Sequence, residues 1–310
     1  MAIVRTNVPI TAESCDRMIQ EIVEAYPFCR TEVIASTTYG RPLRTLVIGN
    51  GPRKVIYSGA HHANEWITSL LILKFVEDLA EAIRQEECIF GLPGKQIAEA
   101  ATIYTVPMVN PDGVDLVVGA IAPGTVEYEQ ARRLGDNYPQ IPFPTGWKAN
   151  LLGVDLNLQY PALWLRAREI KFAQGFTRPG PRDYVGRFPL SQLESRALAE
   201  LTRELDPALV LAYHTQGKVI YWQFQNIPVP GARALAEEFA RLSGYALEEV
   251  PEESSYAGYK DWFIQTYRRP GFTIEVGSGE NPLPLSQFDE IYRDNLGILT
   301  TAALGLPGEA

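Results

Sequence analysis

Residues 60–66 read Ala-His-His-Ala-Asn-Glu-Trp, and they stand between two different hydrophobic patterns. The run 55–57 before them is apolar, as in a buried strand, whereas apolar residues within 72–83 recur at the spacing of one helix face. The stretch therefore lies where a strand leads into a helix. His62 and Glu65 are three residues apart within it, so their side chains project to the same side of a turn.

An imidazole and a carboxylate at this spacing are two of the three protein ligands typical of a catalytic zinc ion. The alternative is a helix start with an acid near its positive end. The chain contains only 3 His, and the one outside this stretch, His214, ends the apolar run 207–213. Because His is so scarce, His214 becomes a candidate for the same metal site.

A length of 310 residues allows two domains, but single α/β domains of this size are common, and we expect one domain that covers residues 1–310. Hydrophobic residues make up 46% of the chain and charged residues 21%, enough for a large core. The net charge of −9 argues against a general nucleic-acid binder or a protein held on a membrane surface. The sequence does not determine an oligomeric state.

The cysteine content and the N-terminal residues indicate the cellular compartment in which the protein is expected. The chain has 3 Cys without a C-x-x-C pair, which is typical of a reduced protein rather than a disulfide scaffold. The N-terminal residues lack the apolar core of a signal peptide, and no run reaches the roughly 20 apolar residues of a membrane span. We therefore expect a cytoplasmic protein.

Alternating strand and helix patterns predict a three-layer α/β/α sandwich around a mixed, largely parallel sheet. A capping box at 191–194 is expected to open one helix, and 110–113 (Asn-Pro-Asp-Gly) to form a turn. The spans 119–150 and 174–190 are expected to be long loops beside a cleft. The expected strands are 31–37, 43–49, 54–59, 103–109, 207–213, 219–222 and 272–276, and the expected helices are 11–25, a segment ending near 84, 191–205, 231–243, 258–267 and 286–303.

Polar side chains stand at the ends of three of these strands. His62 and Glu65 follow one, His214 closes a second, and Glu275 lies near the end of a third. Ligands of open α/β sheets gather at the carboxyl ends of strands. Zinc needs three of these four groups, and a remaining carboxylate can accept a proton from water.

Five motifs in order resemble the zinc carboxypeptidase family, and together they cover most of the chain. They are HANEW (62–66), NPDG (110–113), GVDLN (153–157), YHT (213–215) and TIEV (273–276). The resemblance implies a zinc ion held by His62, Glu65 and His214, with Glu275 as the general base.

The third motif adds two expected roles. The resemblance implies that Asp155 accepts a hydrogen bond from the ring of His62, as metal-bound histidines usually require. It implies that Asn157 positions the substrate through its amide. Without the motif, both residues would be interpreted as parts of a turn.

The chain departs from the digestive members of the family at positions that bind substrate. Leu158 stands where carboxypeptidases carry an arginine that clamps the terminal carboxylate of the substrate. Asn64, which we include among the substrate-binding residues, replaces an arginine between the metal-binding His and Glu. The expected terminal-carboxylate clamp is therefore missing.

A second missing arginine concerns the carbonyl that is attacked. Leu151 and Leu152 occupy the region where family members place a cation that polarises it. Lys148 is the nearest replacement, and we assign it a catalytic role. The loop arginines 132, 133 and 182 are the alternatives.

Within the family, the chain is most similar to bacterial γ-D-glutamyl-diamino acid endopeptidases. The segments WKAN, GVDLNLQYP, AYHTQG and AGYKDWF carry this closer resemblance. It implies hydrolysis of the amide between γ-D-glutamate and a diamino acid in peptidoglycan stem peptides, with a peptide or muropeptide as the partner.

Three further residues enter as substrate contacts through this resemblance. Lys260 falls where family members read the residue after the cut, and an ammonium group there suits a carboxylate of the diamino acid. The alternative is a solvated lysine on a short helix. Tyr259 or Tyr256 supplies the phenol that covers the substrate, although either tyrosine is also suited to packing.

Two rival functions remain open. One is a small-molecule deacylase of the same superfamily, against which the missing arginine at Leu158 counts. The other is a catalytically dead muropeptide-binding module, which the pair Leu151 and Leu152 keeps possible. Hydrolysis of a purified muropeptide would separate the proposed enzyme from the binding module.

Overall fold

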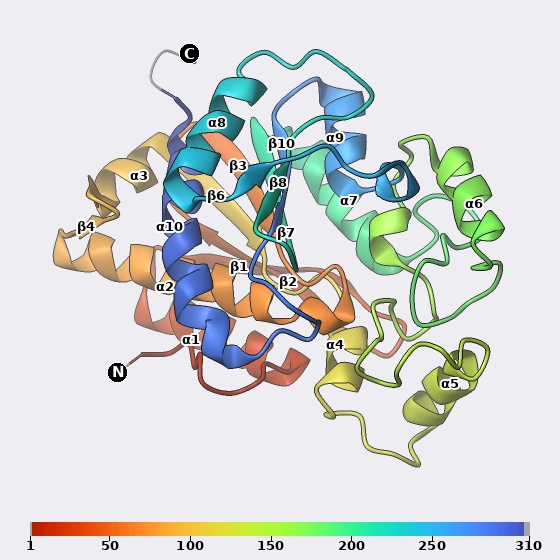
Figure 1. The fold of residues 1–310 in the computed structure, drawn as a ribbon. Helices are drawn as coiled ribbons and strands as arrows, with labels where there is room; N and C mark the ends of the chain where they lie inside the picture. The colour runs from red at the N-terminus through yellow and green to blue at the C-terminus, as the bar shows by residue number, and fades with distance from the viewer. Residues whose placement is uncertain (1, 307–310) are drawn as a thin grey trace.

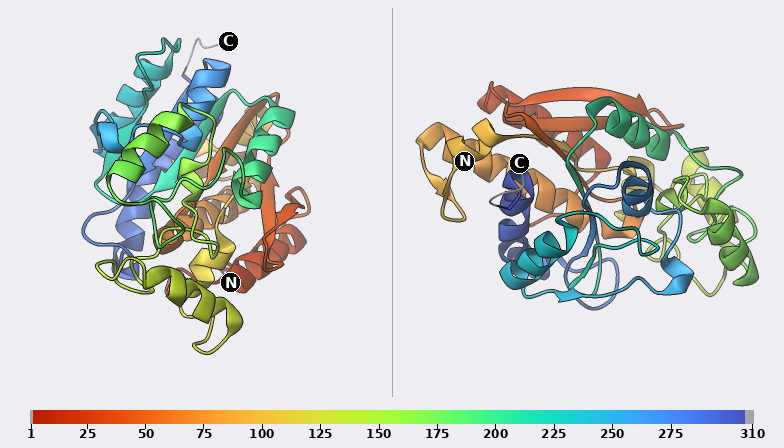
Figure 2. Two further views of the ribbon diagram at one scale, coloured as in Figure 1. Left: turned by 90° about the vertical axis from the view of Figure 1, so that its right-hand side faces the viewer. Right: turned by 90° about the horizontal axis from the view of Figure 1, so that it is seen from above.

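The computed structural model describes residues 2–306 and has a mixed eight-stranded sheet at its centre (Figures 1 and 2). The strands follow the order β1-β2-β6-β3-β7-β10-β8-β9. Helices cover both faces of the sheet, so the predicted three-layer α/β/α sandwich is confirmed. The strands of this sheet are β1 (Arg30–Ser36), β2 (Pro42–Ile48), β3 (Arg53–Ser58), β6 (Ala101–Val106), β7 (Leu209–His214), β8 (Val219–Tyr221), β9 (Ala246–Leu247) and β10 (Gly271–Glu275).

The helices divide between the two faces of the sheet. One core cluster contains side chains from α1, α2, α3, α8 and α10, and a second contains side chains from α7 and α9. Figure 1 shows α5 and α6 on the right-hand side of the molecule, apart from the helices that cover the sheet. The helices are α1 (Ala12–Ala25), α2 (Ile67–Gln85), α3 (Gly94–Ala100), α4 (Pro111–Val117), α5 (Val126–Gly135), α6 (Trp164–Ala173), α7 (Leu193–Leu205), α8 (Ala232–Ser243), α9 (Tyr259–Tyr267) and α10 (Phe288–Leu304), and a small separate ribbon pairs β4 (Cys88–Ile89) with β5 (Leu92–Pro93).

Strand direction and side-chain alternation place the polar strand ends together. β3, β7 and β10 are adjacent and parallel, so their carboxyl ends meet at one edge of the sheet. Successive side chains of a strand point to opposite faces. In β7, Leu211 and Tyr213 join the first core cluster, whereas Val210 and Ala212 join the second. His214 therefore continues the row that faces α7 and α9.

Most of the predicted elements are present, with three corrections. The predicted turn 110–113 instead opens α4, because Pro111 suits the first turn of a helix and Asn110 caps it. The predicted loop 119–150 contains α5, capped by Thr125. The capping box at 191–194 is wrong: α7 follows Gln192, and Ser191 Oγ instead donates a hydrogen bond to Gln159 Oε1 at 2.9 Å.

Asn110 links α4 to the strand ends. Its Oδ1 accepts a hydrogen bond from Gly113 N at 3.0 Å. Its Nδ2 reaches the carbonyl oxygens of His61, Lys148 and Ala149 at 3.2, 3.3 and 3.0 Å. The motif thus joins the segment after β3 to the loop that carries Lys148.

Gly113 is required by the same close approach. A Cβ atom at this position would lie 2.6 Å from the carbonyl oxygen of Ala149 and 2.8 Å from the Cβ of Ala63. Both neighbours belong to segments next to the polar strand ends. A side chain at Gly113 would therefore push those segments apart.

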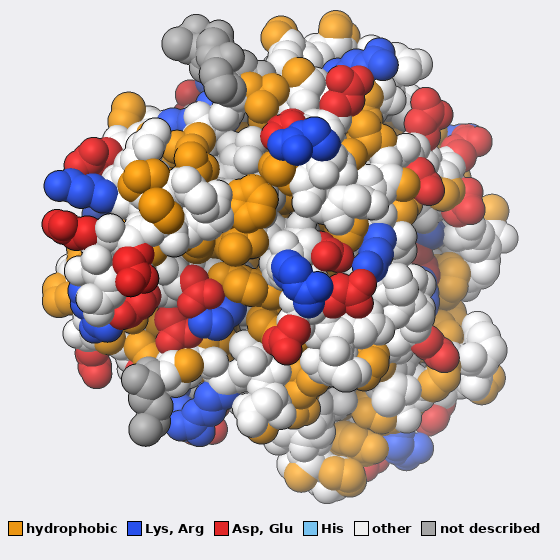
Figure 3. Space-filling model, turned by 60° about the vertical axis from the view of Figure 1, so that its left-hand side comes forward, with side chains coloured by type: hydrophobic (Ala, Val, Ile, Leu, Met, Phe, Trp, Pro, Cys, Tyr) orange, Lys and Arg blue, Asp and Glu red, His pale blue; other side chains and the backbone are white. Residues whose placement is uncertain are grey.

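Charged side chains of both signs are interspersed on the face that carries α2, α3 and α10, with apolar side chains between them (Figure 3). Among residues 2–306, no helix combines the length and the apolar character needed to cross a membrane.

Replacing Asn110 with Ala is expected to lower the free energy of unfolding by about 3 kcal/mol. The substitution removes the cap of α4 and leaves buried carbonyl oxygens without a donor. Urea titration measures the change. Asn137→Ala is the matched control, because Asn137 Nδ2 also donates to a carbonyl oxygen, that of Leu134 at 3.2 Å, but in a half-buried loop. Equal losses in the two variants would contradict the linking role of Asn110.

Candidate active site

His62, Glu65 and His214 converge at the carboxyl edge of the sheet. His62 follows β3, Glu65 ends the short 3-10 helix Ala63–Glu65, and His214 closes β7. His62 Nδ1 lies 2.9 Å from Glu65 Oε1, and His214 Nδ1 lies 2.9 Å from Glu65 Oε2. The two Nδ1 atoms are 3.3 Å apart.

This arrangement fits a zinc ion. Two ring nitrogens face each other, and each lies beside a different oxygen of one buried carboxylate. Two imidazole nitrogens and a carboxylate form a donor set that catalytic zinc sites use. Among the described residues, this is the cluster of His, Cys, Asp and Glu that can hold a metal ion.

Asp155 fixes the ring of His62 from the other side. Asp155 Oδ1 lies 3.1 Å from His62 Nε2, and its Oδ2 accepts a hydrogen bond from Asp183 N at 3.2 Å. Burial favours the neutral acid, but His62 and Lys148 outweigh it and hold the pKa of Asp155 below its usual range. The carboxylate is therefore ionised and directs the Nδ1 of His62 toward Glu65.

Glu275 lies beside His214 on the same face of the sheet, because the two residues are register partners in the parallel pair β7–β10. Burial and the neighbouring Glu65 carboxylate raise the pKa of Glu275 to about 8. Burial also acts on Glu65, but His62 and Lys148 lower its pKa well below the usual range. The two carboxyl groups therefore differ: Glu65 is ionised and Glu275 takes up a proton readily.

Lys148 brings a cation into this cluster. Its Nζ donates to Glu65 Oε1 at 2.9 Å. Burial alone would lower the pKa of Lys148, but the charges of Glu65 and Glu275 raise it. The lysine is therefore protonated beside the two carboxyl groups.

Two cavities open beside the cluster. The first is lined by His62, Asn157, Leu158, His214, Lys260 and Thr273, among others. The second is lined by Asn64, Gln140, Thr145, Thr215, Gln216 and Asn281, among others. Four side chains line both cavities: Lys148, Arg182, Tyr221 and Glu275. These four residues mark the place where the cavities meet.

The family model described as zinc carboxypeptidase matches residues 15–297. The chain belongs to the zinc carboxypeptidase family. Together with the zinc-type donor set, membership makes the protein a zinc metallopeptidase.

Two relatives cover nearly the whole chain. The γ-D-glutamyl-L-diamino acid endopeptidase 1 of Lysinibacillus sphaericus is 46% identical over 280 residues, which are 90% of this chain and 68% of that protein. The uncharacterized protein YqgT of Bacillus subtilis (strain 168) is 37% identical over 289 residues, 93% of this chain and 75% of that protein.

Solved structures share the fold at low sequence identity. Thrombin-activatable fibrinolysis inhibitor matches with a TM-score of 0.76 at 18% identity, covering 98% of this chain and 76% of that one. Murein-tripeptide amidase MpaA from Escherichia coli O157 matches with a TM-score of 0.55 at 17% identity, covering 90% of this chain and 93% of that one. These likenesses concern the fold.

In this zinc peptidase, three of the residues that the sequence predicted to contact substrate line the two cavities. Asn157 lines the first cavity, and its Oδ1 accepts a hydrogen bond from Tyr259 N at 3.0 Å. Asn64 lines the second cavity, and its Nδ2 donates to Thr145 O at 3.2 Å. Lys260 lines the first cavity, but it is only 3% exposed.

The environment of Lys260 differs from both interpretations of the sequence. Its Nζ donates to the carbonyl oxygen of Gln223 at 2.7 Å and to Asp261 Oδ1 at 2.5 Å. The lysine is therefore not a solvated surface residue. Its positive charge is already balanced by Asp261, so a free ammonium for a substrate carboxylate is not what the structure provides.

The predicted covering tyrosines are corrected. Tyr259 is completely buried, and its hydroxyl group forms a hydrogen bond of 2.7 Å with Thr202 Oγ1. Tyr256 is partly buried against two hydrophobic clusters, and in the described part of the chain it is not among the residues that line either cavity. Tyr221 lines both cavities instead. Tyr221 lies near the end of the predicted strand 219–222, and in the structure it is the register partner of Thr273, two residues before Glu275.

The structure also distinguishes among the candidate cations for polarising the attacked carbonyl. Arg132 and Arg133 belong to the outlying helix α5, where Arg132 pairs with Glu129 at 3.1 Å. Arg182 and Lys148 instead reach the junction of the cavities. Leu151 is buried in a core cluster with Trp147, so it takes no part in the site.

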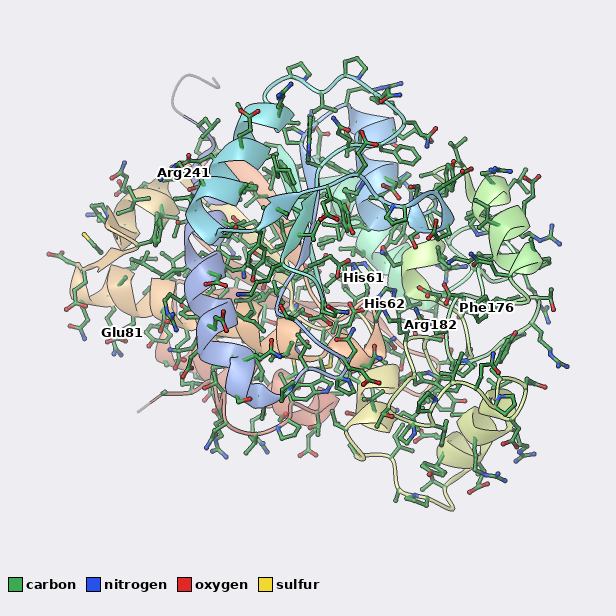
Figure 4. The ribbon with its side chains drawn as sticks, in the orientation of Figure 1. His61, His62, Glu81, Phe176, Arg182 and Arg241 are labelled. Atoms are coloured by element: carbon green, nitrogen blue, oxygen red, sulfur yellow. The ribbon has the colours of Figure 1, made fainter. Side chains whose placement is uncertain are left out.

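His61 is a residue of the site that the sequence analysis left without a role. Figure 4 labels it beside His62, its neighbour in the chain. Its ring stacks on that of His214 with centroids 5.5 Å apart, and its Nε2 lies 3.2 Å from the hydroxyl oxygen of Tyr160. Burial lowers the pKa of His61 well below its usual value, so the ring is neutral. It supports His214 from behind.

Asn150 and Glu194 hold the loop that carries Lys148 and Asp155. Asn150 Oδ1 accepts hydrogen bonds from the backbone of Leu152 and Val154 at 3.2 and 3.1 Å. Asn150 Nδ2 donates to Glu194 Oε1 at 3.2 Å. Burial raises the pKa of Glu194 to about 7.

The raised pKa of Glu194 predicts a pH-dependent stability. Below its usual pKa of about 4.5, the acid is protonated in both the folded and the unfolded chain. Between that value and about 7, the unfolded chain releases a proton that the folded chain retains, so stability falls as pH rises. Between about pH 5 and about pH 8, the wild type is expected to lose roughly 2 to 3 kcal/mol relative to Glu194→Gln. Urea titrations of both proteins measure this difference, and parallel pH profiles would contradict it.

Proposed function

We propose that the protein hydrolyses the amide between γ-D-glutamate and a diamino acid in peptidoglycan stem peptides. In this proposal His62, Glu65 and His214 hold the zinc ion and Glu275 is the general base. The convergence of these four side chains at one edge of the sheet is the observation that carries the proposal. The relative of 46% identity, a γ-D-glutamyl-L-diamino acid endopeptidase, supports the substrate class.

The missing clamp supports cleavage inside a peptide. Leu158 lines the first cavity beside Asn157, at the position of the carboxypeptidase arginine. An apolar side chain cannot bind a terminal carboxylate. The chain of a longer stem peptide can therefore continue past this position without leaving a buried cation unpaired.

The proposed mechanism is hydrolysis by a water molecule. When bound, zinc acts as a Lewis acid on the amide carbonyl and makes a water molecule more acidic. Glu275 accepts the proton of the attacking water and passes it to the leaving amine. Lys148 donates a hydrogen bond to the developing negative charge on the carbonyl oxygen. Asp155 keeps the ring of His62 in its binding orientation.

We also propose that residues 1–310 form one catalytic domain, because the two main core clusters lie on opposite faces of a single sheet.

A cytoplasmic location remains a prediction. It is supported by the three free cysteines, two of which are buried.

The two rivals lack the support that the peptidase has. A deacylase of small acylated amino acids needs a cation for the substrate carboxylate, and Leu158 occupies that position. A dead binding module has no need for a complete zinc-type donor set with Glu275 beside it. A small-molecule deacylase would hydrolyse N-acyl amino acids and leave stem peptides intact.

Glu275→Gln is expected to lower kcat by at least about 100-fold, because the amide cannot accept the proton of water. Zinc content should stay the same, since Glu275 is not among the proposed ligands. Mass spectrometry of tri-, tetra- and pentapeptide stems measures turnover, and elemental analysis measures zinc. Glu280→Gln, which changes another acid that lines the second cavity, is the matched control. Normal turnover by Glu275→Gln would remove the general-base role.

Asp155→Asn is expected to weaken zinc binding by about 10- to 100-fold, because the amide no longer fixes the ring of His62 as a carboxylate does. Competition with a chelator measures the affinity. Asp206→Asn, which alters an exposed acid paired with Arg269, is the control. Unchanged zinc affinity in Asp155→Asn would mean that Asp155 serves the loop and not the metal site.

A further inference from the structure

We propose that Arg182 binds the free α-carboxylate of the γ-linked glutamyl residue and makes the enzyme selective against substrates in which that carboxylate is amidated. The inference rests on the proposed function and names one feature of the substrate that the site recognises. It is carried by the position of Arg182, by the charges around it and by the chemistry of the γ-linkage.

The position of Arg182 is the junction of the two cavities. It lines both of them, together with Lys148, Tyr221 and Glu275. Glu275 is the proposed base, so the scissile amide lies beside it. A side chain shared by both cavities therefore reaches the groups on either side of that amide. Arg182 and His62 both line the first cavity, and their labels lie close together in the view of Figure 4.

The charges around Arg182 leave it with unused binding capacity. Its Nε donates to Asp183 Oδ2 at 2.7 Å, but Asp183 Oδ1 also pairs with the buried Lys171 at 2.7 Å. One carboxylate thus faces two cations. Within the described part of the chain, no hydrogen bond engages the Nη atoms of Arg182, and its side chain is 41% exposed. The guanidinium group can bind an anion with its outer edge.

The other cations that line the cavities are more fully paired. Lys148 contacts Glu65 at 2.9 Å, Lys171 contacts Asp183 at 2.7 Å, and Lys260 contacts Asp261 at 2.5 Å. All three are less exposed than Arg182. An incoming carboxylate would therefore meet Arg182 without first breaking an ion pair.

Arg182 is also held in place before substrate arrives. Asp183, which binds its Nε, donates its own backbone N–H to Asp155 Oδ2 at 3.2 Å. Asp155 in turn contacts His62. The guanidinium group is thus positioned relative to the metal site, which reduces the entropy lost when it binds.

The γ-linkage places a carboxylate where Arg182 can meet it. In a γ-glutamyl amide, the free α-carboxylate is four bonds from the scissile carbonyl carbon, a reach of about 5 Å. An ordinary α-peptide has no charged group fixed at this point of its main chain. The α-carboxylate of the diamino acid is free only at the end of a tripeptide and is an amide in longer stems. The glutamyl α-carboxylate is therefore a free anion on the acyl side of the scissile amide in stems of every length, whereas the carboxylates of the diamino acid lie on the amine side.

The test compares a free-acid substrate with its amide in the wild type and in three variants. The free acid is the tripeptide L-Ala-γ-D-Glu-diamino acid, and in the amide the glutamyl α-carboxylate is converted to an amide. Each form is also used as a tetrapeptide with one further residue, which makes four peptides. The variants are Arg182→Gln, Arg182→Lys and, as a matched control, Arg132→Gln on the outlying helix α5. Binding of the acyl product L-Ala-D-Glu and of its α-amide is measured in parallel by calorimetry.

The wild type is expected to favour the free acid by about 10- to 100-fold in kcat/KM, as for a charged hydrogen-bonded pair. In Arg182→Gln, kcat/KM for the free acid should fall by that factor, so that the variant cleaves the acid and the amide at the same rate. Arg182→Lys should retain part of the preference, because a lysine keeps the charge but not the paired geometry. Arg132→Gln should behave like the wild type.

Three results would overturn the inference while leaving the proposed function intact. The wild type could cleave the acid and the amide equally well. Arg182→Gln could slow both substrates by the same factor, which would indicate a role at the carbonyl oxygen. Arg182→Gln could instead slow the tripeptides more than the tetrapeptides, whether acid or amide, which would indicate that Arg182 binds the α-carboxylate of the diamino acid.

Failure of the proposed function gives a different pattern, namely no cleavage of any γ-glutamyl peptide by the zinc-loaded wild type. The calorimetric arm then still decides whether Arg182 binds the carboxylate of L-Ala-D-Glu. If Arg182→Gln does not fold, the comparison of wild type with Arg182→Lys on both substrates decides the question.

Discussion

The buried carboxylate of Glu65 is the interaction on which the site depends. Its two oxygens face the Nδ1 atoms of His62 and His214, and one of them also accepts a hydrogen bond from Lys148. An ionised carboxylate is costly to bury unless cations or hydrogen-bond donors surround it. These partners come from the segment after β3, from the end of β7, where the backbone N–H of Thr215 also donates to Glu65 Oε2, and from the long loop that carries Lys148. Each of these segments is therefore tied to the others through one side chain.

The rest of the fold keeps these segments in register. The parallel strands β3, β7 and β10 end at one edge, and their alternation turns His214 and Glu275 to the same face. Asn110 ties the segment after β3 to the backbone of Lys148. Behind the metal cluster, the neutral ring of His61 stacks on the ring of His214, whose Nδ1 also contacts Glu65. This is the kind of preorganisation that zinc chemistry requires.

The walls of the cavities distinguish this protein from a digestive carboxypeptidase. Leu158 lines the cavity where an arginine clamp would lie, and Lys260 is neutralised by Asp261. Among the described residues that line the cavities, the cation whose Nη atoms are free to bind an anion is Arg182, at the junction of the cavities. In the proposed role it binds a charge in the middle of the substrate rather than at its end. That position suits the proposed enzyme, which cuts within a stem peptide.

The sequence by itself determined the fold class and the metal cluster. Both depend on local patterns: apolar periodicity defines strands and helices, and the scarcity of histidine leaves few candidate ligands. It also placed Glu275 correctly at a strand end, because a lone acid in an apolar strand stands out. The family resemblance, carried by five motifs in order, agrees with the match over residues 15–297.

Only the tertiary structure decided what surrounds the cluster. The sequence does not show which tyrosines line a cavity. In the structure Tyr259 packs into the core, whereas Tyr221 lines both cavities. The sequence could not distinguish Arg182 from Arg132 and Arg133 as the cation of the site. All three lie in spans that were expected to be loops, where the sequence pattern does not indicate the direction of a side chain. Such residues depend on contacts between segments far apart in the chain. Their roles are set by packing and charge pairing in three dimensions, which one-dimensional spacing does not record.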